Sequence, residues 1–310
     1  MKTLVFGKDG QLGRAFQQRL SSIPNVYFLG RQECNLASSV SVKNCIEQFM
    51  PDQIINAAAY TAVDKAEDDM QTAFAINEGA VAEMASYCHI NNKRLLHFST
   101  DYVFNGQKSS PYVESDVCNP LNVYGQSKRA GERMIQEIFS KKENNLTQVY
   151  GSGTFFILRT TWVYGDGTNF IRKILRLAKE RSELKIVSDQ YGVPTSADWL
   201  SNLSLILLDR TDIPSGIYHA TPSGRTNWYE LAQFVLECAK ELEISFKLEF
   251  DHLFPIPANQ YSLPAKRPEN SIFSTEKLSR TLLPVQSLLE EDWRTRVKAY
   301  IYALHKQGSI

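Results

Sequence analysis

The sequence predicts an α/β protein with a doubly wound parallel sheet and a second, smaller domain. Short apolar runs alternate with longer amphipathic stretches through the first half of the chain. Those runs contain few polar residues, which is typical of strands buried on both faces of a parallel sheet. A glycine-rich segment follows the first run directly, as expected for a tight turn from a strand into a helix. Together these observations favour a Rossmann-type architecture.

Five apolar runs are expected to form the strands. Each is short, rich in Val, Ile, Leu or Phe, and bounded by polar or glycine-containing segments. In chain order they are Thr3 to Gly7, Val26 to Gly30, Gln53 to Ala59, Arg94 to Thr100 and Phe155 to Thr160. The stretches between them have helical patterns, so strands and helices alternate as a doubly wound sheet requires.

The second half of the chain has a different pattern. Helices are expected at Asn169 to Arg181 and at Asn227 to Leu242, separated by loops that contain prolines. Residues 1–161 are therefore predicted to form the sheet domain, with returns to it from about residues 186–220. Residues 162–310 are predicted to form most of a smaller, interleaved domain. The polar segment 141–154 is expected to be a surface loop.

Composition narrows the class of protein. The 310 residues are 43% hydrophobic and 22% charged, which is enough for one large core or two ordinary ones. Lys plus Arg and Asp plus Glu both number 34, so the formal net charge is zero. No overall field gathers nucleic acid or anionic lipid, and neither is an expected partner.

Cysteines, histidines and apolar segments bear on chemistry and location. Five cysteines are widely spaced without a CxxC pair, which indicates neither a disulfide framework nor a zinc site, and no metal is expected. This usage fits a reducing cytoplasm. The first apolar run is too short for a signal peptide, and no run reaches ~18 apolar residues, so no membrane span is expected. The five scattered histidines are expected to be structural.

Three glycines mark a phosphate-binding turn. Gly7, Gly10 and Gly13 follow the first strand and stand at the start of a helix that begins near Gln11. In this context a G-x-x-G-x-x-G turn lets the backbone approach a pyrophosphate, and the free amides of the helix N-terminus face its charge. Residues 1–161 are therefore predicted to be a dinucleotide-binding domain.

The end of the second strand indicates which dinucleotide binds. NAD-dependent enzymes usually place an acidic residue here to accept from the ribose 2′-hydroxyl, whereas this chain has Arg31 after Gly30. A guanidinium can bind a 2′-phosphate through two N–H groups and can stack on adenine. NADPH is therefore the predicted cofactor, and the nearby Glu33 leaves NADH open.

Thr100, Tyr124 and Lys128 are the candidate catalytic residues. Thr100 ends the fourth strand, at the edge of the sheet where ligands bind in such folds. Tyr124 and Lys128 are four residues apart in NPLNVYGQSKRAGER (residues 119–133) and share a helix face. An ammonium near a phenol favours the phenolate, so Lys128 is expected to lower the pKa of Tyr124 and make it a usable acid. The Thr100 hydroxyl is expected to donate to the same carbonyl oxygen.

These motifs resemble those of the extended short-chain dehydrogenase/reductase family, and within it the reductases of dTDP-linked 4-keto-6-deoxysugars. The matching segments, which span nearly the whole chain, are FGKDGQLG, NAAAYTAVDKAE, STDYVFNG, PLNVYGQSKRAGE, LRTTWVYG, DQYGVPT and PAKRPENS. The resemblance implies NADPH-dependent reduction of the 4-keto group of dTDP-4-dehydro-6-deoxy-L-mannose. The product would be dTDP-L-rhamnose, and Tyr124 would be the proton donor.

The resemblance also implies a role for each matching position. The cofactor would contact Gly7, Gly10, Gln11, Leu12 and Gly13 at the pyrophosphate, Arg31, Asn35 and Leu36 at the adenosine, and Ala59, Tyr60, Thr61, Tyr124 and Lys128 toward the nicotinamide. The small dTDP-sugar substrate would contact Thr100, Asp101, Trp162, Gln190 and Arg267, with Tyr191 at the mouth of the same cleft. Residues 162–310 would thus be mostly substrate-binding.

Three alternatives stay open. A reductase of another dTDP-4-keto-6-deoxysugar would share these motifs. A dehydratase or epimerase of the same fold needs a further acid/base pair, usually Asp-Glu after the threonine, whereas Thr100 is followed here by Asp101 and Tyr102. A non-catalytic regulatory subunit is compatible with the fold. The complete set of Thr100, Tyr124 and Lys128 argues against it.

One departure from the family concerns assembly. Some members hold Mg²⁺ at a dimer interface through a carboxylate early in the first helix, but this chain has Arg14 and Ala15 there. Neither that metal nor that dimer is carried over. Apolar helix faces are nevertheless compatible with a homodimer.

Overall fold

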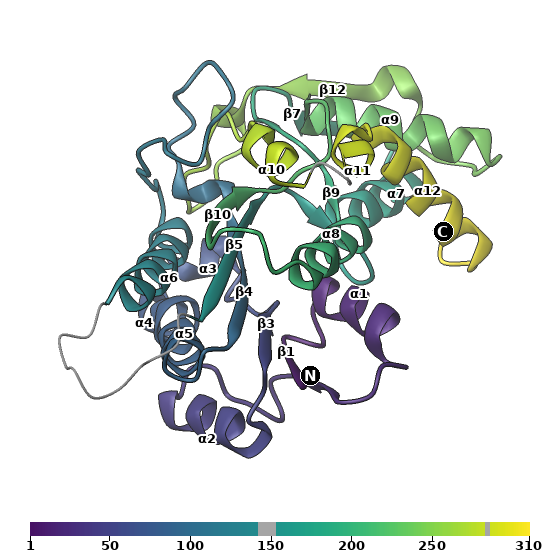
Figure 1. Ribbon diagram of the computed structural model, residues 1–310. Coiled ribbons are helices and arrows are strands. Elements are labelled where there is room, and N and C mark those ends of the chain that lie inside the picture. The colour runs from purple at the N-terminus through teal and green to yellow at the C-terminus, as the bar shows by residue number, and fades with distance from the viewer. Residues whose placement is uncertain (142–152, 283–285) are drawn as a thin grey trace, which may run out of the picture.

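Figure 1 shows a computed structural model of the chain, which describes residues 1–141, 153–282 and 286–310. Most of the segment 141–154, expected to be a surface loop, lies outside the described residues. The centre is a six-stranded sheet in the order β10-β5-β4-β3-β1-β2, and every neighbouring pair is parallel. The strands are β1 (Thr3–Phe6), β2 (Val26–Leu29), β3 (Gln53–Asn56), β4 (Arg94–Thr100), β5 (Thr154–Thr160) and β10 (Gly216–His219). The predicted doubly wound parallel sheet is confirmed.

The strand order places a switch point beside β1. The chain goes outward from β1 to β2 and then returns to the other side of β1 for β3. The connections after β1 and β3 therefore leave the sheet in opposite directions and open a crevice at the carboxyl ends of these strands. Ligands of doubly wound sheets bind at this crevice.

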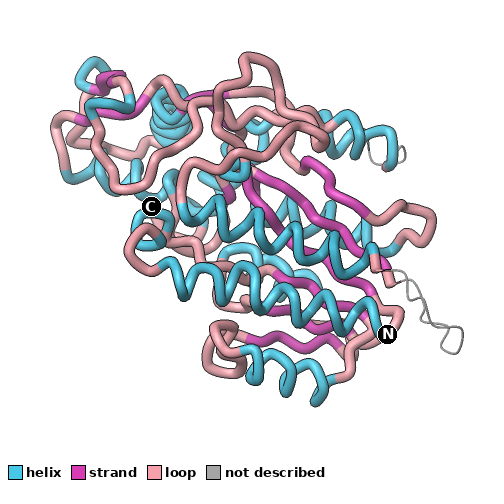
Figure 2. The backbone as a smooth tube through the Cα atoms, turned by 90° about the vertical axis from the view of Figure 1, so that its left-hand side faces the viewer, coloured by secondary structure: helices cyan, strands magenta, loops and turns pink. Residues whose placement is uncertain are grey.

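Helices cover both faces of the sheet, as Figure 2 shows. Alternate strand residues point to opposite faces. Val5, Ile55 and Leu96 pack against α1 (Gln11–Leu20) and α8 (Ala197–Asp209), together with α10 (Glu276–Thr281) and α11 (Gln286–Glu290). Their neighbours Leu4, Ile54 and Leu95 pack on the other face, against α2 (Ser39–Phe49), α5 (Ala80–Ile90) and α6 (Val123–Ser140). Both faces are thus apolar, which explains the unbroken hydrophobic runs of the strands.

Short helical pieces connect β3 and β4 to the helices that follow them. They are α3 (Val63–Ala66), α4 (Met70–Phe74) and the π-helix η1 (Ala75–Gly79), which continues into α5, and the 3₁₀ turn η2 (Asp101–Val103) directly after β4. Within the described residues, no helix has the length and apolar character needed to cross a lipid bilayer.

A second core lies at one end of the sheet. It is built on α7 (Phe170–Glu180), α9 (Trp228–Glu241) and α12 (Trp293–Lys306), and the helices predicted at 169–181 and 227–242 are confirmed as α7 and α9. Three two-stranded ribbons complete it: β6 (Val163–Tyr164) with β9 (Thr195–Ser196), β7 (Leu184–Val187) with β12 (Leu253–Ile256), and β8 (Tyr191–Gly192) with β11 (Thr226–Asn227). Two further 3₁₀ turns are η3 (Phe250–His252) and η4 (Ala258–Gln260). Helices α8, α10 and α11 and strand β10 leave this half of the chain and pack with the central sheet.

Candidate active site

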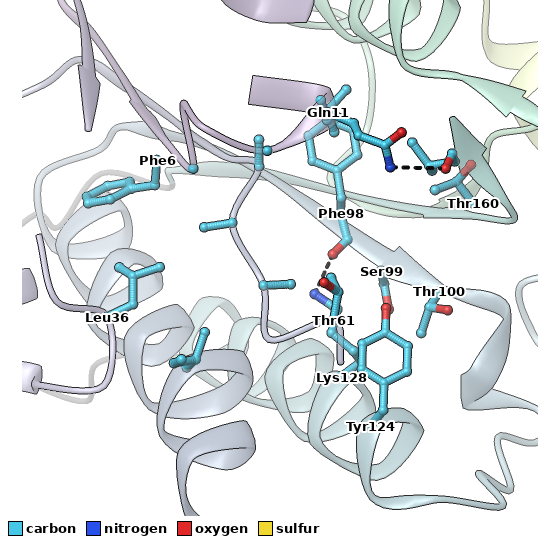
Figure 3. Close-up of a pocket in the computed structure, with 18 of the residues that line it drawn as sticks. Phe6, Gln11, Leu36, Thr61, Phe98, Ser99, Thr100, Tyr124, Lys128 and Thr160 are labelled. Atoms are coloured by element: carbon cyan, nitrogen blue, oxygen red, sulfur yellow. Dashed lines mark hydrogen bonds between the residues drawn. The ribbon is translucent and has the colours of Figure 1, made fainter. Parts of the chain in front are cut away.

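A cleft of about 800 Å³ opens at the carboxyl ends of the central strands, at the switch point between β1 and β3. Its walls come from the segments that follow β1, β3, β4 and β5, and from the second core. Figure 3 shows Ser99 and Thr100 of β4 beside Tyr124 and Lys128 of α6. The cleft therefore brings the predicted catalytic residues to the edge of the sheet where ligands bind.

The phosphate-binding turn packs too closely for larger residues. Gly7 has a φ of 88°, and a Cβ there would lie 2.7 Å from the Ala58 nitrogen. A Cβ on Gly13 would lie 1.9 Å from the Gly7 oxygen, so Gly13 lets α1 begin directly against the turn. Gly7 and Gly10 line the cleft, whereas Gly13 does not. Because Gly10 gives α1 no side-chain cap, the first amides of the helix are available to an anion.

Gln11 connects this turn to the second core. Gln11 and Leu12 both line the cleft, as Figure 3 shows for Gln11. The Gln11 Oε1 accepts from the Gly165 amide at 2.8 Å, and its Nε2 donates to the Val163 oxygen at 3.3 Å. Close by, the buried Thr160 hydroxyl has no hydrogen-bond partner within the described residues, so a bound polar ligand can supply one.

Arg31 follows β2 at the end of the cleft where the adenosine is predicted to bind, which is called the adenosine end below, and its guanidinium is free. Its side chain is exposed, lines the cleft and has no ion pair or hydrogen bond to any described residue. Glu33, the acidic residue that could instead accept from the ribose of NADH, already has partners. It forms an ion pair with Lys8 and accepts from the Gly30 amide at 2.8 Å. The hydrogen bond from Lys8 lowers the pKa of Glu33. Two more predicted residues line this end, Asn35 and Leu36.

The segment after β3 lines the cleft with only some of its residues. Ala59 and Thr61 line the cleft, but Tyr60 between them does not. The Tyr60 amide donates to Asn77 Oδ1 at 2.9 Å, and its hydroxyl donates to Asp69 at 3.1 Å. The side chain of Tyr60 thus anchors the segment and leaves the lining to its smaller neighbours.

Close packing places Tyr124 at the end of β4. Asn122 caps α6 by accepting from the Gly125 amide at 2.8 Å. A Cβ on Gly125 would lie 2.2 Å from the Tyr102 oxygen, so only glycine lets the helix start so near the strand end. Tyr124, Lys128 and Thr100 consequently line one cleft.

Tyr124 is held as a protonated acid. Burial raises the pKa of Tyr124 to about 12; the Thr100 hydroxyl opposes this shift and the charge of Asp101 adds to it. The direction is opposite to the lowered pKa expected from Lys128, because desolvation outweighs the other protein groups around the phenol. At neutral pH the phenol is therefore protonated.

Lys128 is engaged with β4. Its side chain is 2% exposed, and Nζ lies 2.6 Å from the Phe98 oxygen, to which it donates, and 3.1 Å from His97 Nε2. Burial lowers the pKa of Lys128 to about 8, against the charge of Glu132 on the same helix. The amine is therefore still mostly protonated at neutral pH, as expected from the sequence, but loses its proton at mildly alkaline pH.

Thr100 and Asp101 form a buried pair at the substrate side. Thr100 Oγ1 donates to Asp101 Oδ1 at 2.9 Å and accepts from the Tyr102 amide at 3.2 Å. The other carboxylate oxygen accepts from the Ser271 hydroxyl, which comes from the second half of the chain. Burial raises the pKa of Asp101 to about 6, although the hydrogen bonds from Ser271 and Thr100 oppose it.

Two stacked indoles form the opposite wall. Trp162 and Trp228 both line the cleft, with ring centroids 3.6 Å apart and planes at 14°. Trp162 has a φ of 44°, a conformation that L residues rarely adopt and that often marks a functional position. A Cβ on Gly192 would lie 2.4 Å from the Trp162 ring, so glycine gives the indole its room.

Two predicted substrate residues do not line the cleft. Arg267 binds Asp64 through two contacts, of 2.8 Å and 3.2 Å, and also donates to the Ala265 oxygen. Gln190 is half-buried just before β8. Its neighbour Tyr191 has the Arg225 guanidinium over its ring, 4.8 Å from the centroid.

Sequence reasoning missed several lining residues. They include Phe98, Ser99, Thr160, Thr161 and Trp228. Ser99, Thr160 and Thr161 stand at the carboxyl ends of two predicted strands, and that position was a usable signal. Trp228 gave no local signal, because only the fold brings α9 against the segment after β5.

The phosphate-binding turn beside a Thr-Tyr-Lys set defines an NAD(P)-dependent oxidoreductase of the short-chain dehydrogenase/reductase type. The family model described as "RmlD substrate binding domain" matches residues 1–306, and the chain belongs to this family. Among curated relatives, the dTDP-4-dehydrorhamnose reductase of Burkholderia thailandensis is 37% identical over 305 residues, which cover 96% of this chain and 97% of the relative. That of Escherichia coli K12 is 37% identical over 319 residues, covering all of both chains.

Solved structures agree with this assignment. A dTDP-4-dehydrorhamnose reductase from Clostridium acetobutylicum superposes with a TM-score of 0.85 at 30% identity, covering 98% of this chain and 100% of the other. The enzyme of Bacillus anthracis, solved in complex with NADP, gives a TM-score of 0.83 at 28% identity with the same coverage. The family resemblance seen in the sequence is confirmed.

Proposed function

We propose that the protein reduces the 4-keto group of dTDP-4-dehydro-6-deoxy-L-mannose (dTDP-4-dehydrorhamnose) with NADPH, giving dTDP-L-rhamnose. The observation that carries the proposal is the meeting of Thr100, Tyr124 and Lys128 in one cleft with the phosphate-binding turn. The names of the relatives support the sugar, and the NADP complex of a relative supports the cofactor.

The cleft fits the dinucleotide at three points. Gly7 and Gly10 line the cleft without side chains, and the uncapped start of α1 presents amides to a pyrophosphate. The unpaired guanidinium of Arg31 suits a 2′-phosphate, which favours NADPH over NADH. The orphan hydroxyl of Thr160 offers one more polar contact. When bound, the nicotinamide supplies the hydride.

The chain's own groups manage the proton. Tyr124 stays protonated because its pKa is about 12, and it gives its proton to the carbonyl oxygen as the hydride reaches the carbon. Thr100 turns its hydroxyl from Asp101 to the same oxygen and stabilises the developing charge. Low solvent access around Tyr124 and Lys128 strengthens both effects.

The sugar nucleotide is proposed to bind mostly to residues 162–310. Trp162 and Trp228 provide an aromatic wall for it, and Asp101 provides a hydrogen-bond acceptor. Arg267 is proposed to bind the diphosphate, which requires the guanidinium to exchange part of its contact with Asp64. Gln190 is proposed at the mouth of the cleft. A homodimer and a cytoplasmic location stay predictions.

Incubation of the purified protein with NADPH and the dTDP-4-keto-L-sugar tests the proposal. NADPH oxidation should depend on the sugar, and NMR should identify dTDP-L-rhamnose as the product. A different 6-deoxyhexose would reassign the substrate. Absence of NADPH oxidation with every dTDP-4-keto sugar, together with tight binding to another enzyme, would indicate a regulatory subunit instead.

A further inference from the structure

A buried polar chain runs from β3 to the catalytic lysine. Asn56 Nδ2 lies 3.1 Å from His97 Nδ1, and His97 Nε2 lies 3.1 Å from Lys128 Nζ. Asn56, His97 and Lys128 are 1%, 0% and 2% exposed. Only Lys128 of the three lines the cleft, so the other two stand directly behind the catalytic residues. Buried polar groups placed in this way need matched donors and acceptors.

The direction of these hydrogen bonds is set at Asn56. The Ala58 amide donates to Asn56 Oδ1 at 3.2 Å, which leaves the Nδ2 group to face His97. An amide nitrogen can only donate, so His97 Nδ1 must accept and must lack a proton. A neutral imidazole carries one proton, which then sits on Nε2 and points at Lys128.

This arrangement favours a neutral amine at Lys128. A neutral Nζ can accept from His97 Nε2–H while it donates to the Phe98 oxygen, but an ammonium has no lone pair to offer. Burial lowers the pKa of both Lys128 and His97, and the charge of Lys128 lowers the pKa of His97 further. The opposing carboxylate, Glu132, is held by Arg159 and Arg129. Tyr124, Asp101 and Tyr102 are the other titratable residues that line the cleft at this end.

Protonation of Lys128 requires the hydrogen bonds between Asn56, His97 and Lys128 to reverse their direction. His97 would have to move its proton to Nδ1 and accept from the ammonium at Nε2. Asn56 would then have to turn its oxygen to His97 and give up the Ala58 amide, which lines the cleft. The protonation of Lys128 is therefore coupled to the His97 tautomer and to the Asn56 amide.

We propose that His97, oriented by Asn56, is a positioning residue that sets the pH range in which Lys128 is charged. The inference rests on the proposed function. The charged form of Lys128 favours the Tyr124 phenolate that is left after proton transfer to the carbonyl oxygen, so the hydrogen bond to His97 sets the pH at which that support is lost.

Nitrogen-15 NMR of the histidine rings tests the tautomer in the protein without cofactor. At about pH 9, where Lys128 is mostly neutral, His97 should carry its proton on Nε2. His219 is an internal control, because its Nδ1 lies 3.1 Å from the Tyr112 carbonyl oxygen and must donate to it. The two rings should therefore show opposite tautomers. Signals are assigned with His97→Gln and His219→Gln. A proton on Nδ1 of His97 would overturn the inference.

The pH dependence of kcat/KM tests the consequence. In Asn56→Asp the carboxylate still accepts from Ala58 and fixes the His97 proton on Nδ1, so Nε2 accepts from the ammonium. In His97→Gln the amide oxygen can turn to Lys128. Both variants should move the alkaline limb of the profile up by about one pH unit or more. His219→Gln, which changes a buried histidine outside the cleft, should leave the limb in place.

The inference is contradicted if Asn56→Asp and His97→Gln lose activity equally at all pH values while the alkaline limb of the kcat/KM profile stays in place. His97 would then be merely structural. If one variant does not fold, the other and the NMR spectrum of the unmodified protein still decide. The two proposals fail differently: an unmodified protein without turnover contradicts the function, whereas normal turnover with an unshifted limb contradicts only the role of His97.

Discussion

The two ends of the cleft are built in opposite ways. At the catalytic end, Lys128 and Asp101 are almost fully buried, and each has its polar atoms bonded to neighbouring protein groups. At the adenosine end, Arg31 is exposed and has no partner within the described residues. Burial shifts the pKa of Tyr124, Lys128 and Asp101, all at the first end.

The difference indicates how each end works. Buried groups act through desolvated contacts, so their protonation and geometry control the chemical step and part of the stability. An exposed guanidinium acts through attraction that water and salt screen, so it adjusts affinity and cofactor choice. Changes at the catalytic end should therefore have larger effects than changes at the adenosine end.

Replacement of Tyr124 by Phe should have the largest effect. The variant removes the proton donor and keeps the ring, so kcat should fall roughly 10²- to 10⁴-fold. NADPH affinity, measured by fluorescence titration, should stay almost unchanged. Tyr87→Phe is the matched control, because the Tyr87 hydroxyl donates to the Pro51 oxygen and does not line the cleft. Near-normal turnover in Tyr124→Phe would mean that another group is the acid.

Removal of one buried charge on α6, the helix that carries Tyr124 and Lys128, should have the next largest effect. Glu132 and Arg159 form a fully buried pair with two contacts of 2.7 Å. Glu132→Gln leaves the guanidinium without a counter-charge, which should lower the free energy of unfolding by about 3–5 kcal/mol in urea denaturation.

A matched control stands on the same helix. Glu137 contacts the exposed Arg133 at 3.4 Å, so Glu137→Gln should cost less than about 1 kcal/mol. Equal losses in Glu132→Gln and Glu137→Gln would show that burial does not distinguish the two pairs.

Burial of Asp101 should make the free energy of unfolding depend on pH. Its pKa is about 6 in the folded protein and about 3.9 in an unfolded chain, so the folded state binds more protons between these values. Stability therefore falls as the pH rises from about 4 to about 6, by up to about 3 kcal/mol, and Asp101→Asn should remove this fall.

Urea denaturation at about pH 4 and about pH 7 measures the effect of Asp101. Asp212→Asn is the control, because Arg210 lowers the pKa of Asp212 to about 2, the opposite direction. The prediction fails if Asp101→Asn keeps the same pH dependence as the unmodified protein.

Arg31 should give the smallest effect. Arg31→Asp replaces a donor for the 2′-phosphate by a repelling carboxylate, so the ratio of kcat/KM for NADPH to that for NADH should fall roughly ten- to a hundredfold. Arg176→Asp on α7, which changes another exposed arginine, should keep the ratio. An unchanged ratio in Arg31→Asp would show that another residue reads the phosphate.

Local patterns were sufficient for the sheet and for much of the cleft. The five predicted strands form as β1 to β5, since runs such as RLLHFST are apolar enough to be buried on both faces. Thr100, Tyr124 and Lys128 are predicted from the end of an apolar run and from a four-residue spacing on a helix, and the structure places all three in one cleft. His97 was classed as structural, because one polar residue inside an apolar run gives no sign of its partner on another element.

The sequence by itself determined the order of strands and helices, the phosphate-binding turn and the residue types at the strand ends, all of which depend on short-range sterics and hydrophobic pattern. The tertiary structure decided that the pKa of Tyr124 is raised and not lowered, that Lys128 faces His97 and that Arg267 pairs with Asp64. The physical reason is desolvation: the cost of a charge depends on everything packed around it in space, whereas the sequence shows only its neighbours along the chain.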